Sequence, residues 1–148
     1  MKIDKETELF LKNRVKSKAK LHHLLEPNEL RQDRLKQLKE DNLTPPQILS
    51  IKNIKVKSDC NKDINLRFYF PQNFKQNKKN SIIIFFHGGG FVMGNLDTHD
   101  FTCRSICIES KMIVIAVDYS LSPECKFPYA LNEAKDTLKS IPSFEKEF

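Results

Sequence analysis

Residues 81–94 read S-I-I-I-F-F-H-G-G-G-F-V-M-G, and this stretch decides the fold of the chain. The run Ile82–Phe86 contains no polar residue, which is typical of a strand covered on both faces in a parallel sheet. Three glycines follow almost at once, so the backbone can turn sharply and leave bare N–H groups at the carboxyl end of the strand. Open α/β sheets place their chemistry at this edge, and N–H groups there can stabilise negative charge developing on an oxygen. A plain strand-to-helix turn is the alternative interpretation.

The rest of the chain is predicted to alternate between helices and strands. Apolar periodicity and capping residues predict four helices, with Asp97 or Thr98 capping the third: residues 4–25, 27–40, 97–110 and 130–140. Three further strands are expected, the last as uniformly apolar as Ile82–Phe86: residues 51–57, 64–70 and 112–117. Together these patterns indicate an α/β protein.

Two motifs stand out, the first beginning inside residues 81–94 and the second following at residue 117. The first is His87-Gly88-Gly89-Gly90-Phe91, continued by Gly94 and by Leu96-Asp97-Thr98-His99-Asp100. The second is Val117-Asp118-Tyr119-Ser120-Leu121-Ser122-Pro123-Glu124, continued by Phe127-Pro128 and Ala130-Leu131. Together they resemble the hormone-sensitive-lipase-like branch of the α/β-hydrolases, also called the GDXG lipolytic family. The resemblance covers residues 21–141, although family members usually carry Arg and Ala where this chain has Ser120 and Ser122.

The resemblance implies a partial α/β-hydrolase fold. We expect N-terminal cap helices, then two antiparallel strands, then two parallel strands joined by a crossover helix. Residues 1–45 would form a helical cap-like segment, and residues 46–148 the N-terminal part of the hydrolase core. A helical hairpin packed on the sheet edge is the alternative for the first forty or so residues.

The resemblance also assigns an oxyanion hole, the set of N–H donors that binds the charged oxygen during ester cleavage. Gly88 and Gly89 would be the donors, with Gly90 completing the turn. The ring of His87 would hold the loop and would not serve as the histidine of a catalytic triad. Asp118, Tyr119 and Glu124 are expected to be structural, and neither Ser120 nor Ser122 is expected to be a nucleophile.

Esterases of this family carry their nucleophile in a G-x-S-x-G elbow, followed by an acid and a histidine. The 148 residues contain no such motif, and their last glycine is Gly94. The prediction is therefore the N-terminal part of an esterase or lipase-like carboxylic-ester hydrolase, truncated before the elbow and inactive alone. A second polypeptide supplying the C-terminal half and a small acyl-ester substrate are the implied partners. A non-catalytic remnant or pseudoenzyme acting as a binding protein remains the alternative.

The composition narrows the remaining classes of function and predicts the cellular compartment. The net charge is +6, but no dense Lys/Arg block with interleaved aromatics appears, so a basic binding protein for nucleic acid is disfavoured. The first residues are charged, which argues against a signal peptide, and the apolar runs are too short to span a membrane. We therefore expect a cytoplasmic protein. Cys60, Cys103, Cys107 and Cys125 are predicted to be reduced, the middle two packed in the core. His99 and Cys103 have a spacing that a metal site could use, but no metal or cofactor is predicted.

Overall fold

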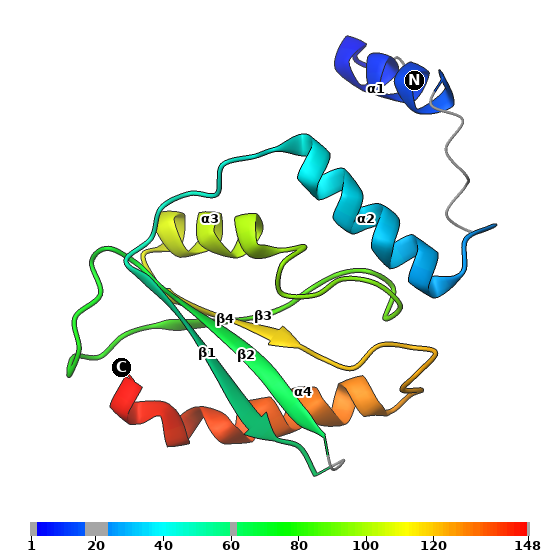
Figure 1. Ribbon diagram of the computed structural model, residues 1–148. Helices are drawn as coiled ribbons and strands as arrows, with labels where there is room; N and C mark the ends of the chain where they lie inside the picture. Colours follow the sequence, from blue (N-terminus) through cyan, green and yellow to red (C-terminus); the bar gives the residue numbers. More distant parts are fainter. Residues whose placement is uncertain (1–2, 17–23, 60–61, 148) are drawn as a thin grey trace.

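The computed structural model describes residues 3–16, 24–59 and 62–147, and within them the chain forms an open sheet with helices on both faces (Figure 1). The strands are β1 (Ser50–Lys57), β2 (Asp63–Phe70), β3 (Ile82–Phe86) and β4 (Ile113–Asp118). The helices are α1 (Lys5–Lys16), α2 (Pro27–Asp41), α3 (Asp100–Ser110), α4 (Tyr129–Ser140) and the 3-10 helix η2 (Ile141–Glu147). All four predicted strands are present.

The strand order is β1-β2-β4-β3. β1 pairs antiparallel with β2 and β2 with β4, whereas β3 and β4 are parallel, with Ile84 opposite Ile115. α3 makes the crossover between β3 and β4, so the predicted antiparallel start and parallel continuation are confirmed. Among the described strands β3 pairs with β4 alone, which makes it an edge of the sheet.

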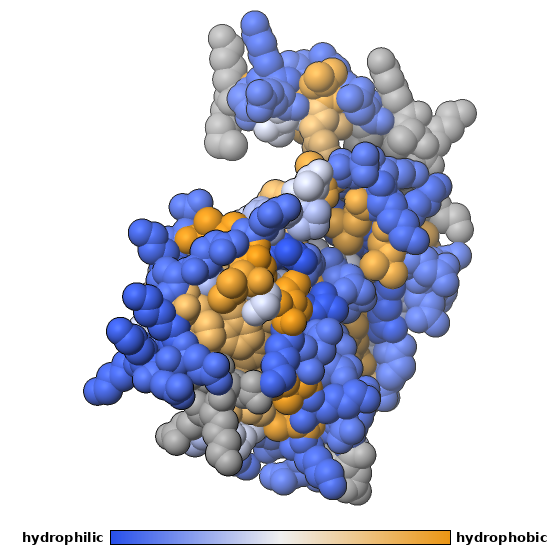
Figure 2. Space-filling view, turned by 60° about the vertical axis from the view of Figure 1, so that its left-hand side comes forward, coloured by the Kyte–Doolittle hydropathy of each residue, from blue (hydrophilic) through white to orange (hydrophobic). Residues whose placement is uncertain are grey.

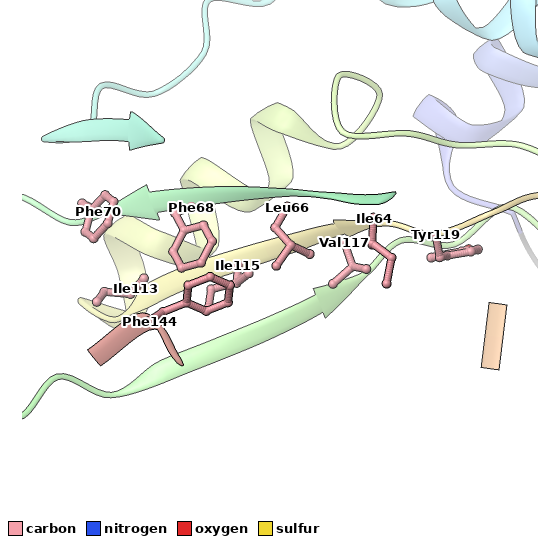
Figure 3. Close-up of a cluster of buried hydrophobic side chains, with 9 residues drawn as sticks. All are labelled: Ile64, Leu66, Phe68, Phe70, Ile113, Ile115, Val117, Tyr119 and Phe144. Carbon is pink, nitrogen blue, oxygen red and sulfur yellow. The ribbon is translucent and has the colours of Figure 1, made fainter. Parts of the chain in front are cut away.

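The hydrophobic core lies on both sides of β2 and β4. Every residue of β4 up to Val117 is buried, as a strand between two helical layers requires. Figure 3 shows side chains of β2 and β4 gathered with Phe144 of η2, whose ring packs edge-on against Phe68 at a centroid distance of 5.3 Å. On the opposite face Tyr69 packs with Cys103 and Cys107 of α3, which confirms the core position predicted for the two cysteines.

The apolar run Ile82–Phe86 suits a strand covered on both faces, but a fold truncated before the nucleophile elbow leaves it at an open edge, and the structure has it at the edge of the described sheet. Its first four side chains are only half-buried, and Phe86 is 39% exposed. The composition of β3 resembles that of β4, but β3 lies at the edge of the sheet, where the described residues supply a neighbouring strand on one side only. Position in the sheet, rather than composition, decides the burial of these two strands.

Two helix boundaries differ from the predictions. α3 begins at Asp100 after His99, because Asp97 and Thr98 belong to a preceding turn: their N–H groups donate to Asn95 Oδ1 at 3.0 and 2.8 Å. α1 is described over Lys5–Lys16, and residues 17–23 lie outside the described part. Leu24 and Leu25 are not α-helical, so the prediction that this helix reaches Leu25 is wrong. Cys60 also lies outside the described residues.

α2 agrees with its prediction and starts with a capping box. The Glu26 N–H donates to Glu29 Oε2 at 3.2 Å, and Pro27 occupies the first turn, where its missing N–H costs nothing. In the part of the chain that is described, no helix combines the length and the apolar character needed to cross a bilayer. Figure 2 shows one face of the molecule, where hydrophilic residues surround patches of apolar side chains.

Candidate active site

The glycine loop, residues 87–94, leaves β3 at the carboxyl end of the parallel strand pair. Phe86 lies opposite Val117, so Asp118 and Tyr119 emerge from β4 beside the loop. Both motifs of the sequence therefore meet at one edge of the sheet, as parallel pairing requires.

The loop is a tight turn centred on Gly89. Its carbonyl accepts hydrogen bonds from the N–H groups of Val92 and Met93, at 3.1 and 3.0 Å. A Cβ on Gly89 would lie 1.9 Å from Met93 O, and its φ of +131° also disfavours a side chain, so the turn itself requires glycine. In contrast, a Cβ on Gly88 or Gly90 would meet no atom within 4 Å.

The three glycines of the loop lie beside a cavity. Among the described residues, no group accepts a hydrogen bond from the N–H of Gly88, Gly89 or Gly90. All three line a cavity of about 820 Å³, whose other walls are largely apolar, among them Phe91 and Leu131. Free donors beside an apolar wall are suited to stabilising negative charge on an oxygen, because such charge is poorly screened there.

His87 and Tyr119 hold the start of the loop. The His87 ring is buried and stacks on Tyr119, with centroids 4.3 Å apart and planes 17° from parallel. Its Nδ1 donates to Gly88 O at 2.9 Å, and Tyr119 Oη donates to His87 O at 2.6 Å. These are the contacts that a loop-holding His87 needs, and they give Tyr119 the structural role expected from the sequence.

Known proteins share this architecture. Residues 83–147 match a family model described as the alpha/beta hydrolase fold. The chain is 45% identical over 71 residues to esterase LipI of Mycobacterium tuberculosis, and 34% identical over 116 residues to carboxylesterase NlhH of the same species. The ester-hydrolase EH1AB1 from the metagenome of Lake Arreo superposes with a TM-score of 0.84 and 26% identity, covering 100% of this chain. The chain is an α/β-hydrolase by its fold, and its sequence is similar to esterases of that fold.

The coverage of these relatives is partial. The matches take in 48% and 76% of this chain but only 22% of LipI and 34% of NlhH, and the superposition covers 47% of EH1AB1. This α/β-hydrolase chain thus spans less than half the length of each relative. The family and the partial fold are confirmed, whereas the division at residue 45 and the lipolytic branch stay predictions.

Ser120 stands where relatives of the predicted branch usually carry arginine. Its N–H and hydroxyl both donate to the buried carboxylate of Glu133 in α4, at 2.6 and 2.7 Å, and Lys62 Nζ donates to its Oγ at 3.1 Å. The α/β-hydrolase loop after β4 is therefore anchored to α4 by a serine and a buried carboxylate. Because the hydroxyl proton of Ser120 is committed to Glu133, the geometry agrees with a structural role for this serine.

The two cysteines of α3 are buried in the core. Burial raises the pKa of Cys103 to about 12 and that of Cys107 to about 11, so both thiols stay protonated near neutral pH. Cys103 faces the core beneath α3 rather than the glycine loop. In the described ranges of this α/β-hydrolase chain, no three His, Cys, Asp or Glu side chains are grouped to hold a metal ion.

Gly94 provides the space that the His87 ring occupies. A Cβ on Gly94 would lie 2.4 Å from His87 Nδ1, and its φ is +102°. We expect Gly94→Ala to displace the ring, break its bond to Gly88 O and lower the unfolding free energy by about 1–3 kcal/mol. Urea unfolding checks this, with Gly88→Ala as the control because its Cβ meets open space. Equal midpoints for the two variants would contradict the assigned role of Gly94.

His99 is expected to make the stability of this α/β-hydrolase chain depend on pH. Its ring stacks on His87 at 5.2 Å, and burial, then the nearby His87 and Arg34, lower its pKa below the ordinary 6.5. The unfolded chain then binds a proton more readily than the folded one, so stability is lost as pH falls below about 6.5. We expect His99→Phe, which keeps an aromatic ring beside Phe85, to reduce the loss between about pH 7.5 and about pH 5.5. Urea midpoints at both pH values measure it, and an unchanged loss would contradict the prediction.

Proposed function

We propose that this chain supplies the oxyanion hole of a carboxylic-ester hydrolase. The observation that carries the proposal is the run of glycine N–H groups that have no acceptor among the described residues and lie beside an apolar cavity. When a nucleophile attacks an ester, the carbonyl oxygen gains negative charge that it lacks in the ground state. Preorganised donors aimed at that oxygen lower the barrier by about 3–4 kcal/mol each.

Each residue of the site has a stated part in this proposal. Gly88 and Gly89 donate to the oxygen, and Gly90 completes the turn that aims them. His87 and Tyr119 fix the start of the loop, so the donors need no reorganisation when charge develops. The apolar walls receive the hydrocarbon part of a small acyl ester and exclude water from it.

The nucleophile, acid and base of the reaction come from polypeptide outside these 148 residues in our proposal. No G-x-S-x-G elbow occurs in them, and both serines of the second motif are engaged. Ser120 bonds to Glu133, and the Ser122 hydroxyl donates to Cys125 O at 3.2 Å. We therefore expect no ester turnover from this chain alone.

Complementation tests the proposal. The 148-residue chain is co-expressed with the part of NlhH that lies beyond its match to this chain, and this pair is called the complemented enzyme below. We expect hydrolysis of p-nitrophenyl butyrate and labelling by a fluorophosphonate from the complemented enzyme, and neither from the chain alone. NlhH split at the same point is the positive control.

Two outcomes would contradict the proposal. Stoichiometric labelling of a serine in the chain alone would show that it holds its own nucleophile. A soluble complex without turnover, beside an active split NlhH, would remove the oxyanion assignment and favour the non-catalytic remnant.

A further inference from the structure

We propose that Arg31, on α2, is a positioning residue that locks the glycine loop in its donor conformation. Its link to catalysis rests on the proposed function, whereas its link to the loop rests on contacts alone. The two motifs gave no indication of this residue, because nothing in the local sequence distinguishes Arg31 from Arg34 on the same helix.

Every N–H of the Arg31 guanidinium has an acceptor. Nε donates to Val92 O at 2.7 Å, and Nη2 donates to Ser122 O at 2.9 Å and to Glu124 Oε2 at 2.9 Å. Nη1 donates to Glu124 Oε1 at 2.7 Å and to Asn28 Oδ1 at 3.3 Å. A guanidinium has five N–H groups, so this side chain is saturated and held in one orientation.

The acceptors come from three parts of the chain. Asn28 lies in α2, Val92 in the glycine loop, and Ser122 and Glu124 in the loop after β4. The last two loops are also joined directly, because Ser122 N–H donates to Phe91 O at 2.7 Å. Arg31 thus closes a network in which the cap-like segment, the glycine loop and the second motif fix one another.

The contact at Val92 reaches the donors through the turn. Arg31 holds the Val92 carbonyl, which shares a peptide unit with the Met93 N–H. That N–H donates to Gly89 O, as the Val92 N–H also does. Holding this peptide unit therefore restrains the Gly89 carbonyl and the Gly90 N–H of the same peptide plane, and through them the turn that carries the Gly88 and Gly89 donors. A loose loop would aim these groups over a wider range, and oxyanion stabilisation depends on a fixed aim.

The chemistry of the side chain suits this role. Two N–H groups of Arg31 donate to the two carboxylate oxygens of Glu124. The Arg31 side chain is only 23% exposed, so its positive charge is paired where it is partly buried. A lysine has a point charge and no planar fork, so it cannot reach both loops and the carboxylate together. We therefore expect Arg31→Lys to restore only part of what Arg31→Gln loses.

Hydrogen exchange on the 148-residue chain tests the loop contact without any need for activity. We expect Arg31→Gln to speed exchange of the Val92 and Met93 amides about tenfold, because a bond to a charged group is lost. The β4 amides Ile113–Val117 should keep their rates, which separates loop positioning from a general loss of stability. The matched control is Lys36→Gln on the same helix, whose side chain is 74% exposed.

Two further results decide the proposal. Glu124→Gln keeps the shape of the acceptor but removes its charge, so it should also speed exchange of the Val92 and Met93 amides. This variant replaces Arg31→Gln in the test if Arg31→Gln proves unstable. In the complemented enzyme, Arg31→Gln should lower kcat about tenfold with KM within about twofold, because aim matters more in the transition state than in binding. Loop exchange equal to that of Lys36→Gln overturns the proposal, whereas an inactive complemented enzyme with fast loop exchange overturns only the proposed function.

Discussion

Gly88→Val is expected to lower kcat of the complemented enzyme about 10²–10³-fold while leaving the fold intact. A Cβ at this position meets no atom within 4 Å, so the side chain is accommodated by the loop. It would extend into the space beside the N–H groups, where the substrate oxygen must lie. The measurement is kcat on p-nitrophenyl butyrate, with the unfolding midpoint of the same preparation as the check on folding.

The choice of Gly88 over Gly89 follows from the geometry of the turn. A side chain on Gly89 would collide with the Met93 carbonyl, so loss of activity in Gly89→Val would report a disrupted loop as much as a blocked donor. Gly88→Ala provides the graded control, with a smaller expected loss than valine. A folded Gly88→Val enzyme with unchanged kcat would remove Gly88 from the oxyanion hole.

The second large effect concerns β3. We expect the isolated 148-residue chain to self-associate at micromolar concentration, because β3 pairs with only one of the described strands and contains no proline or charge. Its five residues are all apolar, and an exposed apolar edge is a template for pairing with another chain. Size-exclusion chromatography with light scattering measures the association.

Two variants make this prediction specific to the edge. Phe86→Lys places a charge on β3 and is expected to reduce self-association, as charges on edge strands do. Leu138→Lys is the matched control, because Leu138 is also exposed and apolar but lies on α4. Equal effects of the two variants, or a monodisperse monomer with protected Ile82–Phe86 amides, would show that the edge is not the contact.

The sequence by itself determined the elements and the place of the site. The apolar runs 82–86 and 112–117 predicted β3 and β4, and the glycines after the first run predicted a loop with bare N–H groups. These features depend on neighbours a few residues apart, so a local pattern encodes them. Parallel pairing then brings the ends of both strands to one edge, which is why the two motifs could be expected to meet.

Only the tertiary structure decided which residues stabilise that site. Two equally apolar strands differ in burial because one lies inside the sheet and the other at its edge. Gly88 and Gly89 look alike in the sequence, but only Gly89 faces a backbone carbonyl across the turn. The Arg31 contacts with Val92 and Glu124 join residues far apart in the chain. Such contacts arise from packing of the whole fold, and no pattern within a single helix or strand carries them.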